Sequence, residues 1–512
     1  MVTDDLPTPQ PPSRPTLLPD PKCSIMTVNG PITGDDDLGR VLMNEHLVCD
    51  ATKKKRNQQS SAMLASASDN SASNDTYITL ANLSKIRSNP FDSQVNMTLS
   101  SMNDIIDEYK QVQVDSTTAS TTTATTILAI TSESNGRDPL SCQKLSKQLG
   151  GGNVNIIIGT TPTGMRSSGG SNGGIGPESA SGSGSNGDQD MKSMIEEDIT
   201  TMEKELMYGI DGYDGSEEDD ANDPKKGQPP NIIRAGFVGE ITVELFDSSK
   251  NIKTSLTPEE VYQVKACAIV SGTTSAPLIV GLSASAAATA AASASESSST
   301  ISTSVAMTAS SSSSQKHIVL QILDLIKECG CKLSNVVISH IDILYSNVPM
   351  IKQILDQSAN VCFDSYGLSY AMHDLNGIYP NIPSVVSCLS NLLSCNPNYV
   401  YQIVLSCGIC MKLQYTKYGG LGYNILWKHL IPKLLQDGAM TRHQLHIVFH
   451  NNPQRLLQFW KEPPKREKPK VYMDCSVCNE KFEPIEGKYY SKYKFVYCSR
   501  PCLLKHINNN FK

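Results

Sequence analysis

The chain has 512 residues, of which 39% are hydrophobic and only 6% are aromatic. Ser, Thr, Ala and Gly are concentrated in a few blocks that cannot bury a core, so the folded part must be much shorter than the chain. The 44 Lys and Arg against 51 Asp and Glu give a net charge of −7, which disfavours a protein built around nucleic acid.

Residues 1–22 are rich in Pro and polar residues, which predicts a disordered tail, and they show no charged-then-apolar signal peptide. No run of about 18 apolar residues occurs, so we expect no membrane-spanning helix. Fifteen cysteines in a long chain without a secretory signal predict reduced thiols and metal ligands rather than disulfides. We therefore expect a soluble, cytoplasmic protein that does not enter a membrane.

Five low-complexity blocks interrupt the chain. Four are dominated by small polar residues, Ala or Gly, and one by acidic residues, and such compositions predict solvated, disordered loops. The blocks are residues 58–74, 115–126, 167–190, 214–230 and 283–314. The last block follows directly after a predicted strand, at a place where it could obstruct access to a site.

Short apolar strands alternate with helical patterns in the rest of the chain. The predicted strands are residues 39–49, 126–131, 153–159, 232–241, 277–280, 335–340, 360–363 and 401–405. The helical patterns are residues 97–113, 139–149, 191–207, 257–270, 317–328, 348–357, 382–393 and 423–437. Near-continuous apolar strands that alternate with helices form parallel sheets covered on both faces. Eight such units predict an α/β fold, a (β/α)8 TIM barrel over residues 23–461, with an open doubly wound sheet as the alternative.

Three side chains at predicted strand ends have metal-binding chemistry. His46, Glu240 and His340 stand at the ends of the first, fourth and sixth predicted strands. In a TIM barrel, functional residues lie at these carboxyl ends, and imidazole and carboxylate both suit zinc. A divalent metal such as zinc is therefore expected if the three converge. The alternative is that each is a hydrogen-bonded or charged residue at the barrel mouth.

Seven short motifs follow one another in an order that one family shares. They are IMTVNGPITGDDDLGRVLMNEHLVCD (25–50), NLSKIRSNPF (82–91), AGFVGEI (235–241), SHID (339–342), FDSYG (363–367), KYGGLGYNILWKHLIP (417–432) and NNPQRLLQF (451–459). The chain thereby resembles the phosphotriesterase-related proteins of the metal-dependent amidohydrolase superfamily. The resemblance implies a (β/α)8 barrel with two divalent metals, usually zinc. In that family a metal-bound hydroxide attacks an ester, an amide or a phosphoester.

Half of the six metal-ligand positions implied by the resemblance are retained. His46 matches the second residue of the family's strand-one His-x-His, Glu240 matches the bridging residue, and His340 matches the strand-six His. These three would be divided between two metals, whereas a catalytic zinc normally has about three protein ligands and a water. One metal held by all three side chains is the remaining arrangement.

The other implied positions carry unsuitable residues. Asn44 replaces the first His of strand one, Gly281 replaces the strand-five His, and Cys407-Gly408 replaces the strand-eight His-Asp pair. Loss of such a general base costs about 10²- to 10⁴-fold in rate. The resemblance therefore predicts a hydrolase barrel with a depleted site that is weakly active or inactive. Cys407, as a thiolate ligand or in a nucleophilic dyad with His340, is a further alternative.

The chain changes character after the barrel. Residues 462–470 are a Pro- and Lys-rich linker, and residues 471–512 contain two close cysteine pairs with the spacing of zinc ligands. The four expected ligands are Cys475, Cys478, Cys498 and Cys502. Zinc would supply the folding energy that so short a segment lacks, so we expect a zinc-finger-like module. His506 as a substitute ligand, and a disulfide framework, are the alternatives.

Basic and aromatic residues are interleaved in this module. They are Lys481, Lys488, Lys492, Lys494, Arg500, Lys505 and Lys512, with Tyr489, Tyr490, Tyr493, Phe495 and Tyr497. They suit either the core and solvated face of a finger or a surface that stacks nucleic acid. Because the whole chain is acidic, a protein partner is favoured over nucleic acid. Two functions remain: a hydrolase of small N-acyl amides or esters, and a non-catalytic adaptor that binds a protein through this module.

Overall fold

A computed structural model provides the coordinates of the chain. It describes residues 23–33, 38–50, 77–91, 93–114, 125–149, 154–163, 186–211, 232–247, 251–284, 316–372, 378–463, 473–482, 484, 489–509 and 511. The chain divides into two compact units, Met1–Lys461 and Glu462–Lys512. The predicted tail and most residues of the five low-complexity blocks lie outside the described residues.

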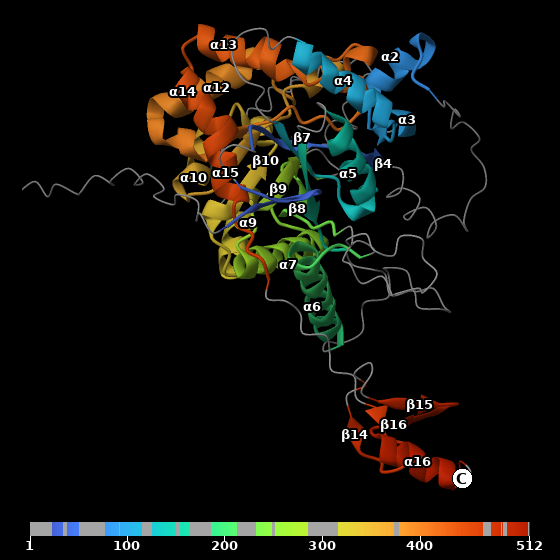
Figure 1. Ribbon diagram of the computed structural model, residues 1–512. Coiled ribbons are helices and arrows are strands. Elements are labelled where there is room, and N and C mark those ends of the chain that lie inside the picture. Colours follow the sequence, from blue (N-terminus) through green and yellow to red (C-terminus); the bar gives the residue numbers. More distant parts are fainter. Residues whose placement is uncertain are drawn as a thin grey trace, which may run out of the picture. The chain divides into compact units, whose positions relative to one another are not determined.

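The larger unit is built on one sheet of eight strands (Figure 1). The strands are β3 (Arg40–Glu45), β6 (Thr125–Ala129), β7 (Val154–Thr160), β8 (Phe237–Glu244), β9 (Leu278–Ser283), β10 (Val336–Ser339), β11 (Asn360–Phe363) and β12 (Ile403–Leu405). Each strand pairs in parallel with the next one along the chain. All eight predicted strands are therefore confirmed, each within a few residues of its expected bounds.

The two edges of this sheet meet, which makes the sheet a barrel. The amide of Asn44 in β3 donates to Ser406 Oγ just after β12 (3.0 Å). In return, the amide of Gly408 donates to the carbonyl of Asn44 (3.2 Å), and the amide of His46 donates to the carbonyl of Ile409 (2.8 Å). The TIM barrel prediction is confirmed, and the open doubly wound alternative is wrong.

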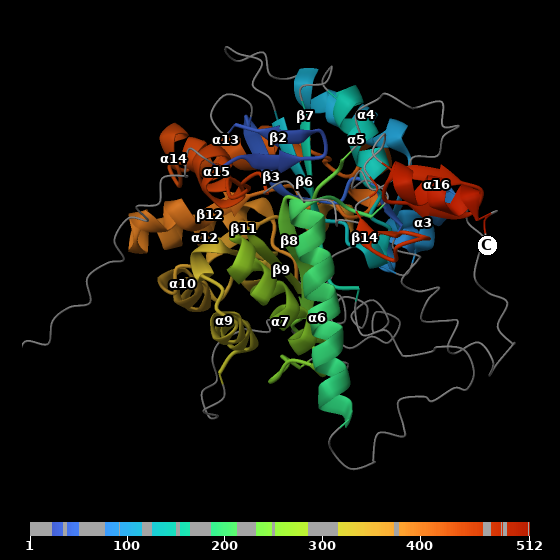
Figure 2. The same ribbon diagram turned by 60° about the horizontal axis from the view of Figure 1, so that its bottom comes forward.

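Helices cover the outside of the barrel (Figures 1 and 2). They are α2 (Leu80–Ser88), α3 (Gln94–Met97), α4 (Met102–Val114), α5 (Pro139–Gln148), α6 (Asn186–Met207), α7 (Pro258–Thr274), α9 (Ile318–Glu328), α10 (Val348–Asp356), α11 (Leu368–Ala371), α12 (Ile382–Cys395), α13 (Ile431–Gln436), α14 (Arg442–His446) and α15 (Asn452–Leu457). No helix among the described residues is long and apolar enough to cross a membrane.

The helix expected over 423–437 consists of a π-helix, Ile425–Leu430, followed by α13, and two further helix boundaries differ from the prediction. The helix expected over 97–113 is interrupted, because β5 (Thr98–Leu99) pairs antiparallel with β4 (Cys49–Asp50). Ser101 then accepts the amide of Asp104 on its hydroxyl (3.3 Å), which starts α4 anew with a serine cap. The second difference is α6, which begins inside the predicted block 167–190.

Side chains alternate along the strands between the barrel interior and the helix layer. In β3, Val41 and Met43 belong to the interior cluster, whereas Leu42 packs in the outer cluster. Seven interior residues continue this layer on the other strands: Leu128, Ile157, Phe237, Ile279, Val337, Cys362 and Val404. Since successive side chains of a strand point to opposite faces, residues two positions further along also face the interior. That is the level at which the candidate site lies.

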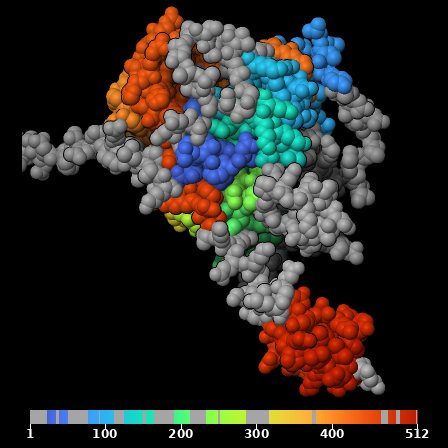
Figure 3. Space-filling model, viewed as in Figure 1, coloured from blue at the N-terminus to red at the C-terminus, as the bar shows by residue number. Residues whose placement is uncertain are grey.

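An N-terminal hairpin joins the end of the barrel. Strands β1 (Ile25–Thr27) and β2 (Gly30–Ile32) pair antiparallel, and Ser24 forms a two-way bridge with Trp460 through backbone hydrogen bonds of 2.8 and 3.1 Å. Figure 3 shows the dark blue hairpin at the surface beside red-orange residues from the end of the barrel. Ile25, which is fully buried, belongs to the interior cluster, so the hairpin is part of the barrel core.

The smaller unit consists of two short hairpins and a helix. They are β13 (Met473–Asp474) with β14 (Lys481–Phe482), β15 (Tyr490–Lys492) with β16 (Phe495–Tyr497), and α16 (Arg500–Asn508). Tyr497 is fully buried, and its hydroxyl lies 3.0 Å from Nδ1 of His506 on α16. Phe495 and Phe511 pack edge-on against the same imidazole. Some of the aromatic residues noted in the sequence therefore form the core of this unit.

Candidate functional site

Irregular pairing in β3 and β8 brings two polar side chains together. The strand register shifts between Leu42 and Glu45, and again between Val238 and Ile241. Such irregularities change the direction in which a side chain points. Asn44 and Glu240 lie within these two segments, and Asn44 Nδ2 donates to Glu240 Oε1 at 2.8 Å. Because β8 continues to Glu244, Glu240 lies inside the strand and not at its end.

The Glu240 carboxylate is surrounded by protein donors. Ser339 Oγ donates to Oε1 at 2.8 Å, and His340 Nε2 lies 3.8 Å from Oε2. Burial alone would raise the pKa of Glu240, but the charge and hydrogen bond of His340 and the Ser339 hydroxyl lower it. The carboxylate is therefore ionised, and both of its oxygens face donors from the protein itself.

His340 lies between two carboxylates. Its Nδ1 donates to Asp364 Oδ1 at 2.7 Å, and its backbone amide donates to the same oxygen at 3.0 Å. Burial would lower the pKa of His340, but the charges of Asp364 and Glu240 outweigh this and raise it well above its usual value. The two carboxylates therefore favour the protonated ring, and each ring nitrogen lies toward a carboxylate.

His46 has the opposite character. Burial, assisted by the charge of His340 and opposed by that of Glu240, lowers its pKa to about 4. It is therefore a neutral imidazole, whose Nδ1 lies 3.2 Å from Thr131 Oγ1. The three predicted residues thus gather at one end of the barrel, where they influence each other electrostatically. Only Glu240 and His340 approach each other closely.

Gly281 and Gly408 stand at positions from which further metal ligands would have to extend, and neighbouring atoms fill the space beside both of them. A Cβ built on Gly281 would lie 2.6 Å from Glu240 Cδ and 2.8 and 2.9 Å from its two oxygens. The Glu240 carboxylate therefore lies directly over Gly281. A Cβ on Gly408 would lie 2.0 Å from the carbonyl oxygen of Asp364, and Gly408 has a positive φ of +60°. Neither position can accept a side chain while its neighbour stays in place.

The residues present do not fit a binuclear metal centre. The two ring nitrogens of His340 lie toward Glu240 and Asp364, the Glu240 oxygens face Asn44, Ser339 and His340, and two expected ligand positions are glycine. Where the structure describes the chain, three or more metal-ligating side chains come close enough to share an ion in one place, the cysteine cluster of the smaller unit. No catalytic step through barrel metals follows from this geometry.

Cys407 is an unreactive buried thiol. Its side chain is 1% exposed, and its Sγ donates to the carbonyl of Tyr423 at 3.6 Å. Burial, followed by the charge and hydrogen bond of Glu45, raises its pKa well above the usual value. A thiolate ligand or nucleophile requires a lowered pKa. The alternatives that gave Cys407 a chemical role are therefore disfavoured.

Sequence reasoning missed two buried carboxylates at the site. Asp364 directly follows β11 and holds His340, and Glu45 sits between the two residues of the Asn44-x-His46 pair. Glu45 accepts hydrogen bonds from Ser406 Oγ (2.7 Å) and from the amides of Cys407 (2.7 Å) and Ile409 (2.9 Å). Burial raises the pKa of Glu45 to about 7, against these hydrogen bonds. A charged residue within or just after an apolar strand was the signal available in the sequence.

The cysteines of the smaller unit form a compact cluster. The sulfur atoms of Cys475, Cys478, Cys498 and Cys502 all lie within 4.8 Å of one another. The Cys498 sulfur is 3.5 Å from that of Cys478 and 3.8 Å from that of Cys502, so the cysteines are free and not disulfide-bonded. Burial would raise the pKa of Cys475, but backbone amides lower it to about 6, which favours a thiolate. His506 belongs to the aromatic core and not to this cluster.

Comparison with known proteins agrees with the geometry of both units. Residues 233–457 match the phosphotriesterase family. The barrel is a phosphotriesterase-family domain. Residues 470–512 match the Vms1-associating treble clef domain, which agrees with the hairpins, helix and cysteine cluster of the smaller unit.

Curated proteins that are similar to this chain include N-acetyltaurine hydrolases. The chain is 24% identical to the N-acetyltaurine hydrolase of Dictyostelium discoideum over 65% of this chain and 68% of the relative. It is 22% identical to the phosphotriesterase-related protein of Nematostella vectensis over 82% of this chain and 95% of the relative. The N-acetyltaurine hydrolase of Salmo salar is 30% identical over 27% of this chain and 40% of its own length.

Solved structures share the barrel fold. A resiniferatoxin-binding protein from Rhodobacter sphaeroides has a TM-score of 0.57 and 23% identity, over 86% of this chain and 97% of its own. A phosphotriesterase homology protein from Escherichia coli has a TM-score of 0.51 and 18% identity, over 83% of this chain and 100% of its own. At these identities the likeness concerns the fold alone.

Proposed function

We propose that this chain is a phosphotriesterase-family protein whose barrel has lost binuclear metal hydrolysis, so that it is weakly active or inactive as a hydrolase. The observation that carries the proposal is the position of the Glu240 carboxylate. It lies over Gly281 and faces donors from Asn44, Ser339 and His340. A bridging ligand must instead direct its oxygens toward two cations.

The charges of the site are partly compensated without a metal. The His340 imidazolium lies between the carboxylates of Asp364 and Glu240, which favours a closed ion-pair network over a site that attracts divalent cations. Hydrolysis would also lack the strand-eight carboxylate, because Gly408 stands in its place. The ligands that the barrel inherited from its lineage are small N-acyl amides or esters. The N-acetyltaurine hydrolases among its relatives support this class.

The test combines metal analysis with turnover of the full-length, zinc-loaded chain. We expect the chain to hold only the metal that the cysteine cluster binds. We also expect it to hydrolyse N-acetyltaurine no faster than the variants His46→Ala and His340→Ala do. Cys478→Ser serves as the matched control, because it removes a ligand from the cluster and leaves the barrel unchanged. Metal that remains in Cys478→Ser, together with turnover that disappears in His46→Ala, would contradict the proposal.

A second candidate function is that of an adaptor that binds a protein through the treble clef unit. We infer that Cys475, Cys478, Cys498 and Cys502 hold a structural zinc, since four clustered thiolates are a common tetrahedral zinc site. The unit presents Tyr493 with 80% of its surface exposed, and the Lys492 ammonium lies 5.8 Å from the centre of that ring. Exposed aromatic residues beside cations are typical of interface anchors. None of the fifteen cysteines forms a disulfide, which favours a reducing compartment such as the cytoplasm.

The adaptor function is tested with Vms1, because the matched domain is described as Vms1-associating. Purified Vms1 is titrated with the full-length chain, and we expect Tyr493→Ala to abolish binding. Tyr77→Ala is the matched control, because Tyr77 is 75% exposed on the larger unit. Equal binding by both variants would exclude Tyr493 as an anchor, and absence of binding by the unaltered chain would exclude this partner.

A further inference from the structure

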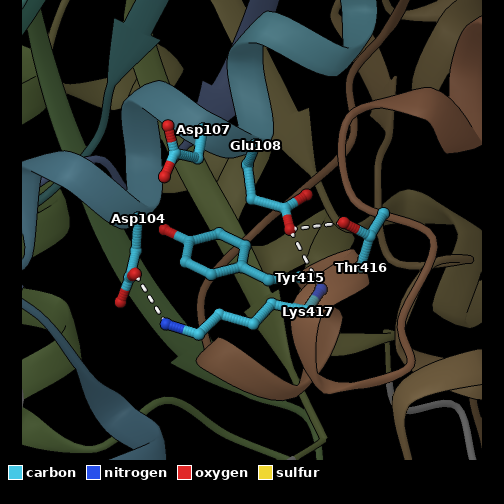
Figure 4. A pocket seen from close by; sticks show the side chains of 6 residues that line it. All are labelled: Asp104, Asp107, Glu108, Tyr415, Thr416 and Lys417. Carbon is cyan, nitrogen blue, oxygen red and sulfur yellow. Dashed lines mark hydrogen bonds and ion pairs between the residues drawn. The ribbon is translucent and has the colours of Figure 1, made fainter.

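A polar pocket of about 380 Å3 lies between α4 and the segment that follows β12 (Figure 4). Its lining residues are Asp104, Asp107, Glu108, Tyr415, Thr416 and Lys417. Asp107 and Glu108 follow Asp104 by three and four residues on α4, so both carboxylates share a helix face with that of Asp104. None of the residues of the candidate barrel site lines this pocket.

Glu108 is a buried carboxylate that the surrounding segment holds in a defined orientation. Its side chain is 4% exposed, and its Oε1 accepts hydrogen bonds from Thr416 Oγ1 (2.6 Å) and the amide of Lys417 (3.2 Å). Its Oε2 has no hydrogen-bond partner and lies close to Gly422, where a Cβ would come within 2.3 Å of it. The carboxylate therefore fixes the wall of the pocket against α4.

Tyr415 supplies the observation that points to a ligand. The residue is 1% exposed, and its hydroxyl has no hydrogen-bond partner. Figure 4 shows this hydroxyl directed into the space between Asp104 and Asp107. A buried hydroxyl without a partner costs about 1–3 kcal/mol, so a group that bonds to it would be stabilised there.

The charges around the Tyr415 hydroxyl favour a positively charged ligand. Asp104 pairs with Lys417 at 2.9 Å and Asp107 pairs with Lys110 at 3.2 Å, and both lysines are more than half exposed. Such surface pairs contribute about 0–1 kcal/mol, so a ligand ammonium can replace them. Among the described residues, the carboxylates of this pocket are not part of a group close enough to share one metal ion. The volume and the spacing suit an organic cation better.

We propose that this pocket binds an alkylammonium or guanidinium group, independently of the function proposed for the barrel. The Tyr415 hydroxyl accepts a hydrogen bond from the ligand N–H, and the carboxylates of Asp104 and Asp107 flank the positive charge. Glu108 holds the segment that carries Tyr415, Thr416 and Lys417. The same chemistry belongs to a free diamine and to a Lys or Arg side chain of a peptide.

The experiment is a calorimetric titration of the full-length, zinc-loaded chain with two probes, 1,4-diaminobutane and a capped Gly-Lys-Gly peptide. We expect at least one of them to bind, and Tyr415→Phe to weaken it about tenfold, as for a hydrogen bond to a charged group. Tyr423→Phe is the matched control, since its buried hydroxyl also has no partner but does not line the pocket. Asp107→Asn is expected to weaken binding about threefold, in line with an exposed charge pair.

The two probes distinguish the sources of the cation. Tighter binding of the diamine supports a free amine, and tighter binding of the peptide supports a protein side chain. Failure of both probes to bind, or equal affinity in Tyr415→Phe and the unaltered chain, would overturn the proposal. Glutarate, a dianion of similar length, must not bind. A thermal melt of each variant verifies that it is folded.

Discussion

Gly281 and Gly408 determine what the neighbouring side chains of the barrel site do. The carboxylate of Glu240 lies over Gly281, and the backbone of Asp364 lies against Gly408. Both acidic residues thereby reach His340 from opposite sides. At the scale of single residues, the absence of two side chains permits the ion-pair network of Glu240, His340 and Asp364.

Replacing Gly408 by Asp is expected to destabilise the chain without restoring hydrolysis. The new Cβ would meet the Asp364 carbonyl oxygen at 2.0 Å, and a non-glycine residue is strained at a φ of +60°. We expect the free energy of unfolding to fall by about 3 kcal/mol or more, measured by urea denaturation.

Gly438→Asp is the control for this substitution. Gly438 has a similar φ of +69°, but a Cβ there would meet no atom within 4 Å. Gly438→Asp should therefore lower the free energy of unfolding by about 1 kcal/mol, which is the cost of the strained backbone alone. Equal losses at the two positions would show that contact with Asp364 is not the reason.

At the scale of elements, Glu45 joins the first strand of the barrel to the segment after the last one. Its carboxylate accepts hydrogen bonds from Ser406 and from the amides of Cys407 and Ile409. Glu45→Ala would leave the buried amides of Cys407 and Ile409 unpaired, while Ser406 Oγ keeps the carbonyl of Asn44 as an acceptor at 3.1 Å. We expect a loss of about 3 kcal/mol or more in the free energy of unfolding, whereas the exposed Glu196→Ala should change it little.

The same variant should alter the pH dependence of stability. The pKa of Glu45 is raised by burial from 4.5 to about 7 in the folded chain. Its proton therefore stabilises the fold fully below pH 4.5, and this contribution is lost as the pH rises through about 7. In Glu45→Ala, the free energy of unfolding should not show this part of the decrease with rising pH. An identical pH profile for both proteins, measured by urea denaturation, would contradict the assignment.

The elements were more predictable than the contacts between them. Apolar runs such as Asn360–Phe363 are strands buried on both faces, and local composition alone identifies them. The break before α4 depends on the pairing of Thr98 with Asp50, a partner far away in the chain. The irregular registers in β3 and β8 also arise from pairing between strands, which no local pattern contains. For the same reason the sequence suggested that His46, Glu240 and His340 gather, but did not reveal that Asp364 holds His340.

At the scale of the whole molecule, the chain consists of two units with separate cores. The smaller unit has about 50 residues and a core of Tyr497, His506 and a few neighbours, which is too small to be stable without a metal. Structural zinc in such units contributes about 10–16 kcal/mol of folding energy.

Removal of zinc by a chelator should therefore unfold the smaller unit and leave the barrel folded. We expect the NMR signals of Tyr497 and His506 to collapse to unfolded positions, while the urea midpoint of the barrel stays the same. Cys478→Ser should reproduce this result, and Cys395→Ser, which changes an exposed cysteine outside the cluster, should not. A lower barrel midpoint after chelation would show that the two units depend on each other.

The contact between Glu240 and Gly281 also limits how this chain can evolve. A histidine that returned to position 281 would meet the Glu240 carboxylate at once, and a carboxylate at position 408 would meet the backbone of Asp364. Each single reversion would lower stability before a metal could bind, so selection would remove it. On the function proposed above, recovery of a metal site would need several changes together, because the neighbour of each glycine would have to move as well. Substitutions around the site would then be selected only for what the chain does now.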